Sequence, residues 1–399
     1  MVSQDRSNVL AQPGELDPEF AEGGVFAVPT TTGSIRSIVA DGQGRFLLAV
    51  WISPEIRLYR IFADGTLDRQ FGQNGVTSWT FVPGVDSVPA KLMVQRDGKF
   101  LLFGSYGQDI FQRQTAFTRF NESGSPDLVF GTKSIAGAEL SGPDACLQAD
   151  GKILVLVRRS LGGNEHRTVL HRFLPNGEID EAFGGQGFID VRFNNQHSQG
   201  ETVAVTEDGN ILVAGTARRE NPTRLTKAVA RFFPSGGVDS SFANEGYWES
   251  GSDITLENIM VYPSGIVCVG RGRTTEQIPC ASISRLTHDG KLDPTFNNGQ
   301  TVAIEIPFDI PVDVVYCGAV TVQADGKIVA GGYVGPFDNA YCLRLLPDGR
   351  LDPDFADQGI KVYIQPTILY DLQQVGPQRL LAAIDTKSPR RPYVFGLQT

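Results

Sequence analysis

Short apolar runs alternate with polar turns along the whole chain. A run such as Ala319–Gly326 (AVTVQADG) ends at a turn, and a second run such as KIVAGG follows at once. Runs of about four to eight residues that are rich in Val, Ile and Leu and bounded by Gly, Asp or Pro are typical of β-strands. No segment keeps the period of an α-helix, so we expect almost no helix.

Each unit of this pattern predicts four strands. The third run carries an arginine, as in YCLRLLPDG, and a polar loop then leads to a fourth run, as in GIKVYIQ. The DG pair at the first connection suits a tight hairpin, because glycine tolerates a positive φ. The second run is apolar at nearly every position, which indicates burial on both faces.

The polar loop has the form D-x-x-F and occurs seven times. Its aspartates are Asp17, Asp68, Asp127, Asp180, Asp239, Asp293 and Asp352. The steps between them are 51, 59, 53, 59, 54 and 59 residues. The phenylalanines three positions later are Phe20, Phe71, Phe130, Phe183, Phe242, Phe296 and Phe355. Arginines precede the last six aspartates by eight residues, at Arg60, Arg119, Arg172, Arg231, Arg285 and Arg344.

Repeats of this kind predict an all-β fold, a seven-bladed β-propeller of four-stranded blades that forms a single domain over residues 1–399. Residues 1–12 form a short tail. The C-terminal RPYVFGLQT reads as a third strand with Gly396 at the arginine position. The N-terminal segment supplies the loop and fourth strand, so a strand near Val25–Val28 is expected to close the last blade and remove an exposed edge. An open solenoid is the alternative.

The repeated loop is predicted to be structural. Its phenylalanine is expected to pack between blades. Its aspartate is expected to accept hydrogen bonds from turn amides or to pair with the arginine at the fixed offset. Catalysis needs one site, whereas these residues form six or seven equivalent sets.

The units resemble the bacterial delta-60 repeat, a propeller-forming family, and more distantly the NHL repeats. The matching signature is VQADGKIVAGG followed by RLLPDGRLDPDFADQG, within Val322–Gly359. In looser form it covers nearly the whole chain. The resemblance implies a bacterial propeller and no defined activity, since fold does not imply function.

Composition narrows the range of functions. The chain of 399 residues has a net charge of −10 and a pI near 5.0, which argues against a whole-surface affinity for nucleic acid or anionic membranes. Its five cysteines include no CxxC pair and are predicted to be reduced structural thiols. No signal peptide or transmembrane run is evident. We expect a cytoplasmic monomer without membrane insertion, with export by a signal-independent route left open.

The loops between second and third strands do not repeat and are rich in arginine. Together these loops contain 13 lysines and arginines and 7 aspartates and glutamates. The candidate binding residues are Arg158, Arg159, His166, Arg167, Arg218, Arg219, Arg224, Arg271, Arg273, Arg390, Arg391, Trp51, Tyr106 and Tyr333. Arginine recognises carboxylate and phosphate through a planar pair of hydrogen bonds, and the three aromatic residues are candidates for stacking on sugars. The alternative is that these charges are solvated and partly neutralised by acids in the connections between blades.

These observations predict a non-catalytic binding scaffold whose arginine-rich loop face holds an anionic protein or an acidic polysaccharide. No cofactor and no nucleic-acid partner are expected. The alternative is a hydrolase or lactonase-type propeller with a metal in the central channel. A structural or adhesion module is a third possibility.

Overall fold

The computed structural model describes residues 12–109, 112–139, 142–162, 165–193, 198–218, 225–251, 254–308, 312–335 and 339–399. Within these ranges every regular element is a β-strand except the 3₁₀ turn Asn297–Gly299. The prediction of an all-β chain with almost no helix is therefore confirmed. Among the described residues, no helix has the length and apolar character needed to cross a membrane.

We group the antiparallel strands into sets of four, which we call blades; one residue pair also joins blades 2 and 3, and one long strand is shared by blades 6 and 7. Blade 1 contains β2 (Ser34–Ala40), β3 (Arg45–Ile52), β4 (Glu55–Phe62) and β5 (Val76–Trp79). Blade 2 contains β6 (Ser87–Val94), β7 (Phe100–Tyr106), β8 (Arg113–Phe120) and β9 (Thr132–Glu139). Blade 3 contains β10 (Asp144–Leu147), β11 (Ile153–Gly162), β12 (Glu165–Phe173) and β13 (Phe188–Val191). Blade 4 contains β14 (Ser198–Val205), β15 (Ile211–Arg218), β16 (Leu225–Phe232) and β17 (Tyr247–Glu249). Blade 5 contains β18 (Thr255–Tyr262), β19 (Gly265–Arg273), β20 (Pro279–Leu286) and β21 (Val302–Ile304).

The long strand β25 (Ile360–Val375) belongs to two blades. Its first part pairs with β24 (Asn339–Leu345), next to β23 (Ile328–Val334) and β22 (Val315–Val322) in blade 6. Its second part pairs with β26 (Arg379–Lys387), which pairs with β27 (Arg390–Gln398). The N-terminal β1 (Val25–Ala27) pairs antiparallel with β27, with Val25 opposite Phe395. This last set is blade 7.

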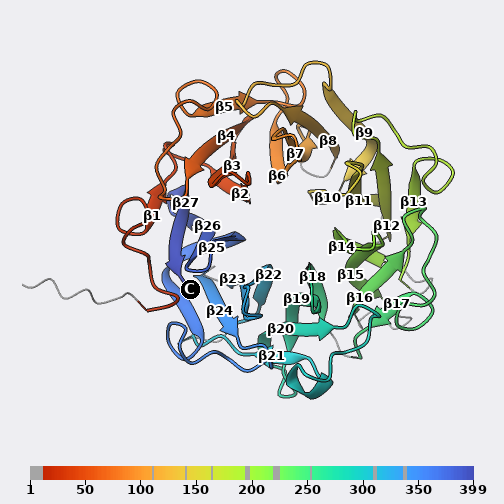
Figure 1. The fold of residues 1–399 in the computed structure, drawn as a ribbon, viewed down its shortest axis with the longest axis vertical. Coiled ribbons are helices and arrows are strands. Elements are labelled where there is room, and N and C mark those ends of the chain that lie inside the picture. The colour runs from red at the N-terminus through yellow and green to blue at the C-terminus, as the bar shows by residue number, and fades with distance from the viewer. Residues whose placement is uncertain are drawn as a thin grey trace, which may run out of the picture.

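The blades are arranged in a ring, and the first strand of each lies innermost (Figure 1). Because neighbouring strands are antiparallel, the connections alternate between two faces of the ring. The loop face carries the connections between second and third strands and those between blades. The turn face carries the first hairpin of each blade and the D-x-x-F loops.

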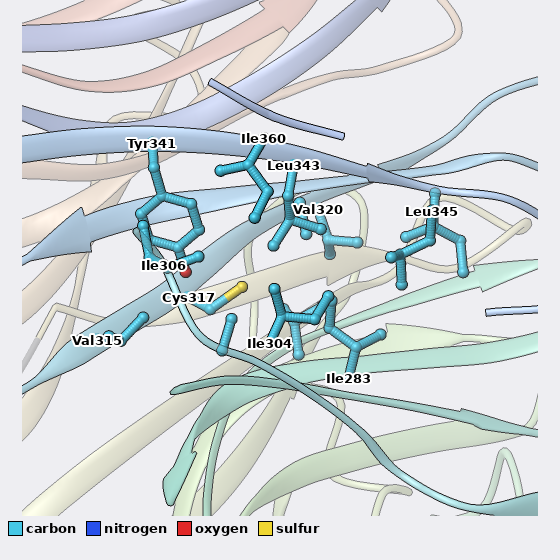
Figure 2. Close-up of a cluster of buried hydrophobic side chains, with 14 of the residues drawn as sticks. Ile283, Ile304, Ile306, Val315, Cys317, Val320, Tyr341, Leu343, Leu345 and Ile360 are labelled. Atoms are coloured by element: carbon cyan, nitrogen blue, oxygen red, sulfur yellow. The ribbon is translucent and has the colours of Figure 1, made fainter. Parts of the chain in front are cut away.

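Burial explains why the second strands are almost wholly apolar. Five consecutive residues of β3, Phe46–Val50, are buried, as are the first seven of β15. The hydrophobic cores lie between blades. In the core between blades 5 and 6, Ile283 and Ile304 lie on one side and Val320 and Leu343 on the other (Figure 2). Each sheet therefore buries both of its faces against its neighbours.

The D-x-x-F loop forms the same cluster in each of six blades. The predicted arginine donates from Nε to the aspartate eight residues later, as in Arg285–Asp293 at 2.8 Å and Arg344–Asp352 at 2.8 Å. The same pairing joins Arg60–Asp68, Arg119–Asp127, Arg172–Asp180 and Arg231–Asp239. In four of these blades the other aspartate oxygen accepts from the backbone amide two residues on, as in Asp293 and Thr295 at 2.8 Å.

This cluster also binds the next blade. The Nη1 atom of Arg285 donates to the carbonyl oxygen of Pro347 in blade 6 at 2.6 Å. The guanidinium carbon of Arg285 lies 4.8 Å from the centre of the Phe296 ring. The ring of Phe296 packs against the turn glycine Gly349, also of blade 6. The repeated loop thus joins successive blades, which supports a structural role.

Candidate binding site on the loop face

Several of the predicted loop-face arginines bind carboxylates. Arg167 holds Asp190 through two hydrogen bonds of 2.5 and 2.6 Å. Arg390 pairs with the buried Asp385 at 3.1 Å. Arg158 pairs with Glu201. The loop face is therefore less cationic than the count along the sequence indicates, because acids from neighbouring strands neutralise these guanidinium groups.

Three of the predicted arginines have no carboxylate partner among the described residues: Arg218, Arg273 and Arg391. Arg273 donates to the carbonyl oxygen of Gln277 at 2.7 Å. Arg391 donates to the carbonyl oxygen of Thr31 at 3.1 Å. Within the part of the chain that the structure describes, these three guanidinium groups are therefore cations open to an anionic partner.

An open groove of about 400 Å³ lies on the loop face where blades 4, 5 and 6 meet. Arg271 and Arg273 line it, together with Thr255, Asp313 and Val314. The side chain of Arg271 is 47% exposed although it lies 3.1 Å from Glu257, and Val314 is also exposed. The groove therefore combines accessible guanidinium groups with an exposed apolar side chain.

Beside this groove, the innermost strands carry β-bulges at equivalent positions. The irregularity falls between Gly200 and Thr202 in β14 and between Leu256 and Asn258 in β18. The bulged residues are thus Glu201 and Glu257. A bulge redirects a side chain out of the regular alternation of a strand, which is how two adjacent inner strands come to present a carboxylate at the same level.

These two carboxylates belong to a mixed group that we call the axial cluster: Arg158, Glu201, Glu257, Arg271, Tyr316 and Tyr333. Burial raises the pKa of Glu201 to about 7; the Arg158 guanidinium lowers it and the Glu257 carboxylate raises it. Desolvation of a carboxyl group favours its neutral form. Glu201 is therefore poised to change charge near neutral pH.

Two tyrosines form the aromatic side of the axial cluster. The rings of Tyr316 and Tyr333 are stacked, with centroids 4.9 Å apart and planes at 22°. Burial raises the pKa of Tyr316, and the nearby charges of Glu257 and Glu201 add to the rise. Among the predicted sugar-stacking residues, Tyr333 thus lies beside charged groups at the inner part of the loop face.

The other two predicted aromatic residues lie in blades 1 and 2. Trp51 directs its indole nitrogen towards Asp86, at 3.4 Å. The hydroxyl of Tyr106 donates to Gln114 at 2.9 Å.

Two of the remaining candidates, Arg159 and His166, lie in blade 3. Nη2 of Arg159 lies 3.3 Å from Nε2 of His171. His166 stands in β12 opposite Ser160. Arg219 and Arg224 lie outside the described residues.

Sequence reasoning missed Glu201, Glu257 and Tyr316. The signal was a charged residue or a tyrosine in an inner strand, well before its turn. The next residue in each strand is often polar too: Thr202 donates to Asp144 in blade 3 at 2.9 Å, and Asn258 donates to the carbonyl oxygen of Gly318 in blade 6 at 2.9 Å. These contacts join inner strands of neighbouring blades.

The channel-metal alternative requires a cluster of ligating side chains. Among the described residues, no group of three or more His, Cys, Asp or Glu side chains is arranged to hold a metal ion. We therefore derive no step through a metal.

Three segments of the chain match a family model described as "Domain of unknown function (DUF5122) beta-propeller": residues 148–183, 206–242 and 323–355. Each segment runs from the end of an inner strand to the D-x-x-F loop of the same blade. No curated protein matches the chain. The match supports a propeller repeat family and does not indicate an activity.

Solved structures resemble the chain at low identity. The β-propeller domain of the Trilobed protease from Pyrococcus furiosus is 11% identical, with a TM-score of 0.50 over 93% of this chain and 96% of that chain. A virginiamycin B lyase from Staphylococcus aureus is 12% identical, with a TM-score of 0.47 over 93% and 98%. An α-L-arabinofuranosidase from Fusarium graminearum is 8% identical, with a TM-score of 0.49 over 97% and 96%. The chain thus has a β-propeller fold, and three of its segments resemble this propeller repeat family.

Proposed function

We propose that the protein is a non-catalytic binding scaffold that holds an anionic partner on its loop face, in the groove lined by Arg271 and Arg273. The observation that carries the proposal is the groove itself. It brings together the exposed guanidinium of Arg271 and that of Arg273, which has no carboxylate partner within the described ranges, beside the exposed apolar side chain of Val314. Variable loops on a rigid frame are a common place for binding, and arginine suits carboxylate and phosphate.

The same proposal takes the frame to be a seven-bladed propeller whose last blade is completed by the N-terminal strand. The pairing of β1 with β27 supports it. A second support is the backbone amide of Asp17, which donates to the carbonyl oxygen of Gly396 at 2.8 Å. A closed ring would hold the loop-face groups at fixed separations without a ligand.

The test uses two polyanions, poly-L-glutamate and polygalacturonate, titrated into the full chain at low and moderate salt. We expect at least one to bind, with an affinity that falls as salt rises. The double variant Arg271→Glu/Arg273→Glu should bind at least 10-fold more weakly.

A matched control reverses two cations on the turn face, Lys291→Glu/Arg350→Glu, whose side chains are 74% and 77% exposed. This control should bind as the wild type does. Loss of affinity to the same extent in both double variants, or no binding of either polyanion to the wild type, would overturn the proposal.

A further inference from the structure

The groove lined by Arg271 and Arg273 has an apolar lining as well as charged groups. Its apolar residues come from blades 4, 5 and 6 and the connections between them: Leu225, Ile254, Pro279, Val314 and Val315. Of the ten exposed large hydrophobic residues within the described ranges, only Ile278 and Val314 lie on the loop face. Val314 lines the groove, and Ile278 lies between Gln277 and Pro279, which also line it. The exposed apolar surface of the loop face is therefore gathered at this groove.

Charges of both signs are available in the same groove. Two arginines and one acid, Asp313, line it, and Glu257 lies 3.1 Å from Arg271. These four charges sum to zero. Glu257 pairs with Arg271, whereas Arg273 and the exposed Asp313 have no partner of opposite charge in the part of the chain that the structure describes. The groove thus offers an unpaired cation and an unpaired anion beside an apolar surface.

The wall that carries the arginines is held in place without a ligand. After β19 ends at Arg273, the backbone N–H of Thr274 donates to the carbonyl oxygen of Ile278 at 2.8 Å, and that of Gln277 donates to the carbonyl oxygen of Thr274 at 2.9 Å. The Nη1 atom of Arg273 donates to the carbonyl oxygen of Gln277 at 2.7 Å. This bond fixes the guanidinium against the turn and leaves its other N–H donors for a ligand. A wall that is ordered in advance lowers the entropic cost of binding.

This combination is complementary to a polypeptide. A segment with a large apolar side chain between an acidic and a basic side chain can satisfy Arg273, Val314 and Asp313 together. An acidic polysaccharide supplies carboxylates but neither a cation nor an aliphatic side chain. The volume of about 400 Å³ lies at the small end of ligand pockets, which span about 300 to 1,000 Å³, and suits a few side chains of an extended segment.

We propose that this groove binds an extended segment of an anionic protein partner, with a large apolar side chain against Val314, a carboxylate at Arg273 and a basic side chain at Asp313. This inference rests on the proposed function, because it names the chemistry of the anionic partner. The two arginines attract polyanions in general, and the apolar side chain adds the affinity that selects this segment.

The experiment titrates the full chain with a short peptide, blocked at both ends, in which two central leucines lie between one lysine and one glutamate. Arg273→Gln should weaken binding of this peptide about 5-fold. It should have no effect on a peptide whose glutamate is replaced by glutamine, because the ion pair is then already lost. Asp313→Asn should show the same dependence on the lysine of the peptide.

A second set of changes tests the apolar contact. Replacement of both leucines of the peptide by serine should weaken binding about 10-fold. Val314→Asp should weaken binding of the leucine peptide to a similar extent, and Val314→Ile should keep it. Leu292→Asp is the matched control, because Leu292 is 37% exposed, as Val314 is, but lines a separate groove of about 420 Å³ at the turn face. Thermal unfolding shows whether each variant is folded.

The outcomes separate this inference from the proposed function. Binding of poly-L-glutamate or polygalacturonate without binding of the leucine peptide would overturn the inference and leave the proposed function standing. Equal affinities of the leucine and serine peptides, or equal losses in Val314→Asp and Leu292→Asp, would also overturn it. Losses in Arg273→Gln and Asp313→Asn that do not depend on the charges of the peptide would overturn the two ion pairs. If neither polyanion nor the leucine peptide binds, the proposed function fails as well.

Discussion

Arg379 donates from its Nε atom to the carboxylate of Asp17, which lies 362 residues earlier in the chain. In the other six blades the arginine of this cluster comes from the third strand, but here that position is Gly396. A Cβ added at Gly396 would lie 2.5 Å from Phe20. The guanidinium therefore comes from the second strand, and its Nη1 atom still reaches the next blade, at the carbonyl oxygen of Ala63, at 2.8 Å.

Removal of this contact tests how much the two ends of the chain stabilise each other. Asp17 is buried, and loss of one partner of a buried ion pair typically costs about 3 to 5 kcal/mol. Since Arg379 is partly exposed, we expect Asp17→Ala to lower the free energy of unfolding by about 2 to 3 kcal/mol in urea titrations. Glu19→Ala, at an exposed site two residues on, is the control. Equal stability of both variants would show that the N-terminal segment contributes little.

The packing of phenylalanine between blades is tested at two glycines with similar positive φ angles. Gly290 has φ +84°, and a Cβ there would lie 2.7 Å from the ring of Phe242 in the preceding blade. Gly42 has φ +79° and no atom within 4 Å of an added Cβ. Gly42→Ala should cost about 1 kcal/mol through backbone strain alone. Gly290→Ala should lower the free energy of unfolding by about 1 to 3 kcal/mol more than Gly42→Ala, because the added methyl group overpacks the contact with Phe242. Equal losses of stability in the two variants, measured by thermal unfolding, would contradict packing of this ring between blades.

Lys227 is a fully buried lysine whose Nζ donates to the carbonyl oxygen of Ser282 at 2.9 Å. Burial lowers its pKa to about 8. Because the unfolded value is about 10.4, the unfolded chain binds more protons between these two values, and the contribution of Lys227 to stability rises with pH across that window.

Replacement of this buried ammonium by an apolar side chain of similar length should not destabilise the fold. We expect Lys227→Met to be at least as stable as the wild type at pH 7.5. The difference in free energy of unfolding between Lys227→Met and the wild type should shrink by about 1 kcal/mol per pH unit between pH 8 and 10. Lys291→Met, at an exposed lysine, should show no such trend below pH 10. A Lys227→Met variant that unfolds more easily at every pH would show that the hydrogen bond to Ser282 outweighs desolvation.

The charge state of Glu201 should control anion binding. With its pKa raised to about 7 by burial, Glu201 gains a negative charge as pH rises from 6 to 8, next to Glu257 and opposite Arg158 and Arg271. Affinity for polygalacturonate should therefore fall over this range by up to about 10-fold. In Glu201→Gln the affinity should be flat between pH 6 and 8. The same slope in both proteins would assign the effect to another group.

The fold could be predicted from the sequence because each blade repeats the same arrangement of hairpin, strands and loop. The hairpin glycines, the apolar second strand and the arginine–aspartate spacing all lie within one unit, so each copy supports the others. The site did not follow in the same way. Whether Arg158 or Arg167 is free depends on Glu201 and Asp190, which lie on other strands, and such pairs become visible only when the strands are placed. The bulges that present Glu201 and Glu257 leave only a weak signal in the sequence, a charged residue in the inner strand well before its turn.

Binding of partners on the loop face around blades 4 to 6 can be mapped along the chain. The most direct measurement is hydrogen–deuterium exchange of the full chain with and without saturating polygalacturonate. If the partner binds on the loop face, peptides that cover residues 254–280 and 312–335 should exchange more slowly, and the D-x-x-F loops of the turn face should not change. Protection confined to the turn face, or no protection under conditions where binding is measured independently, would contradict it.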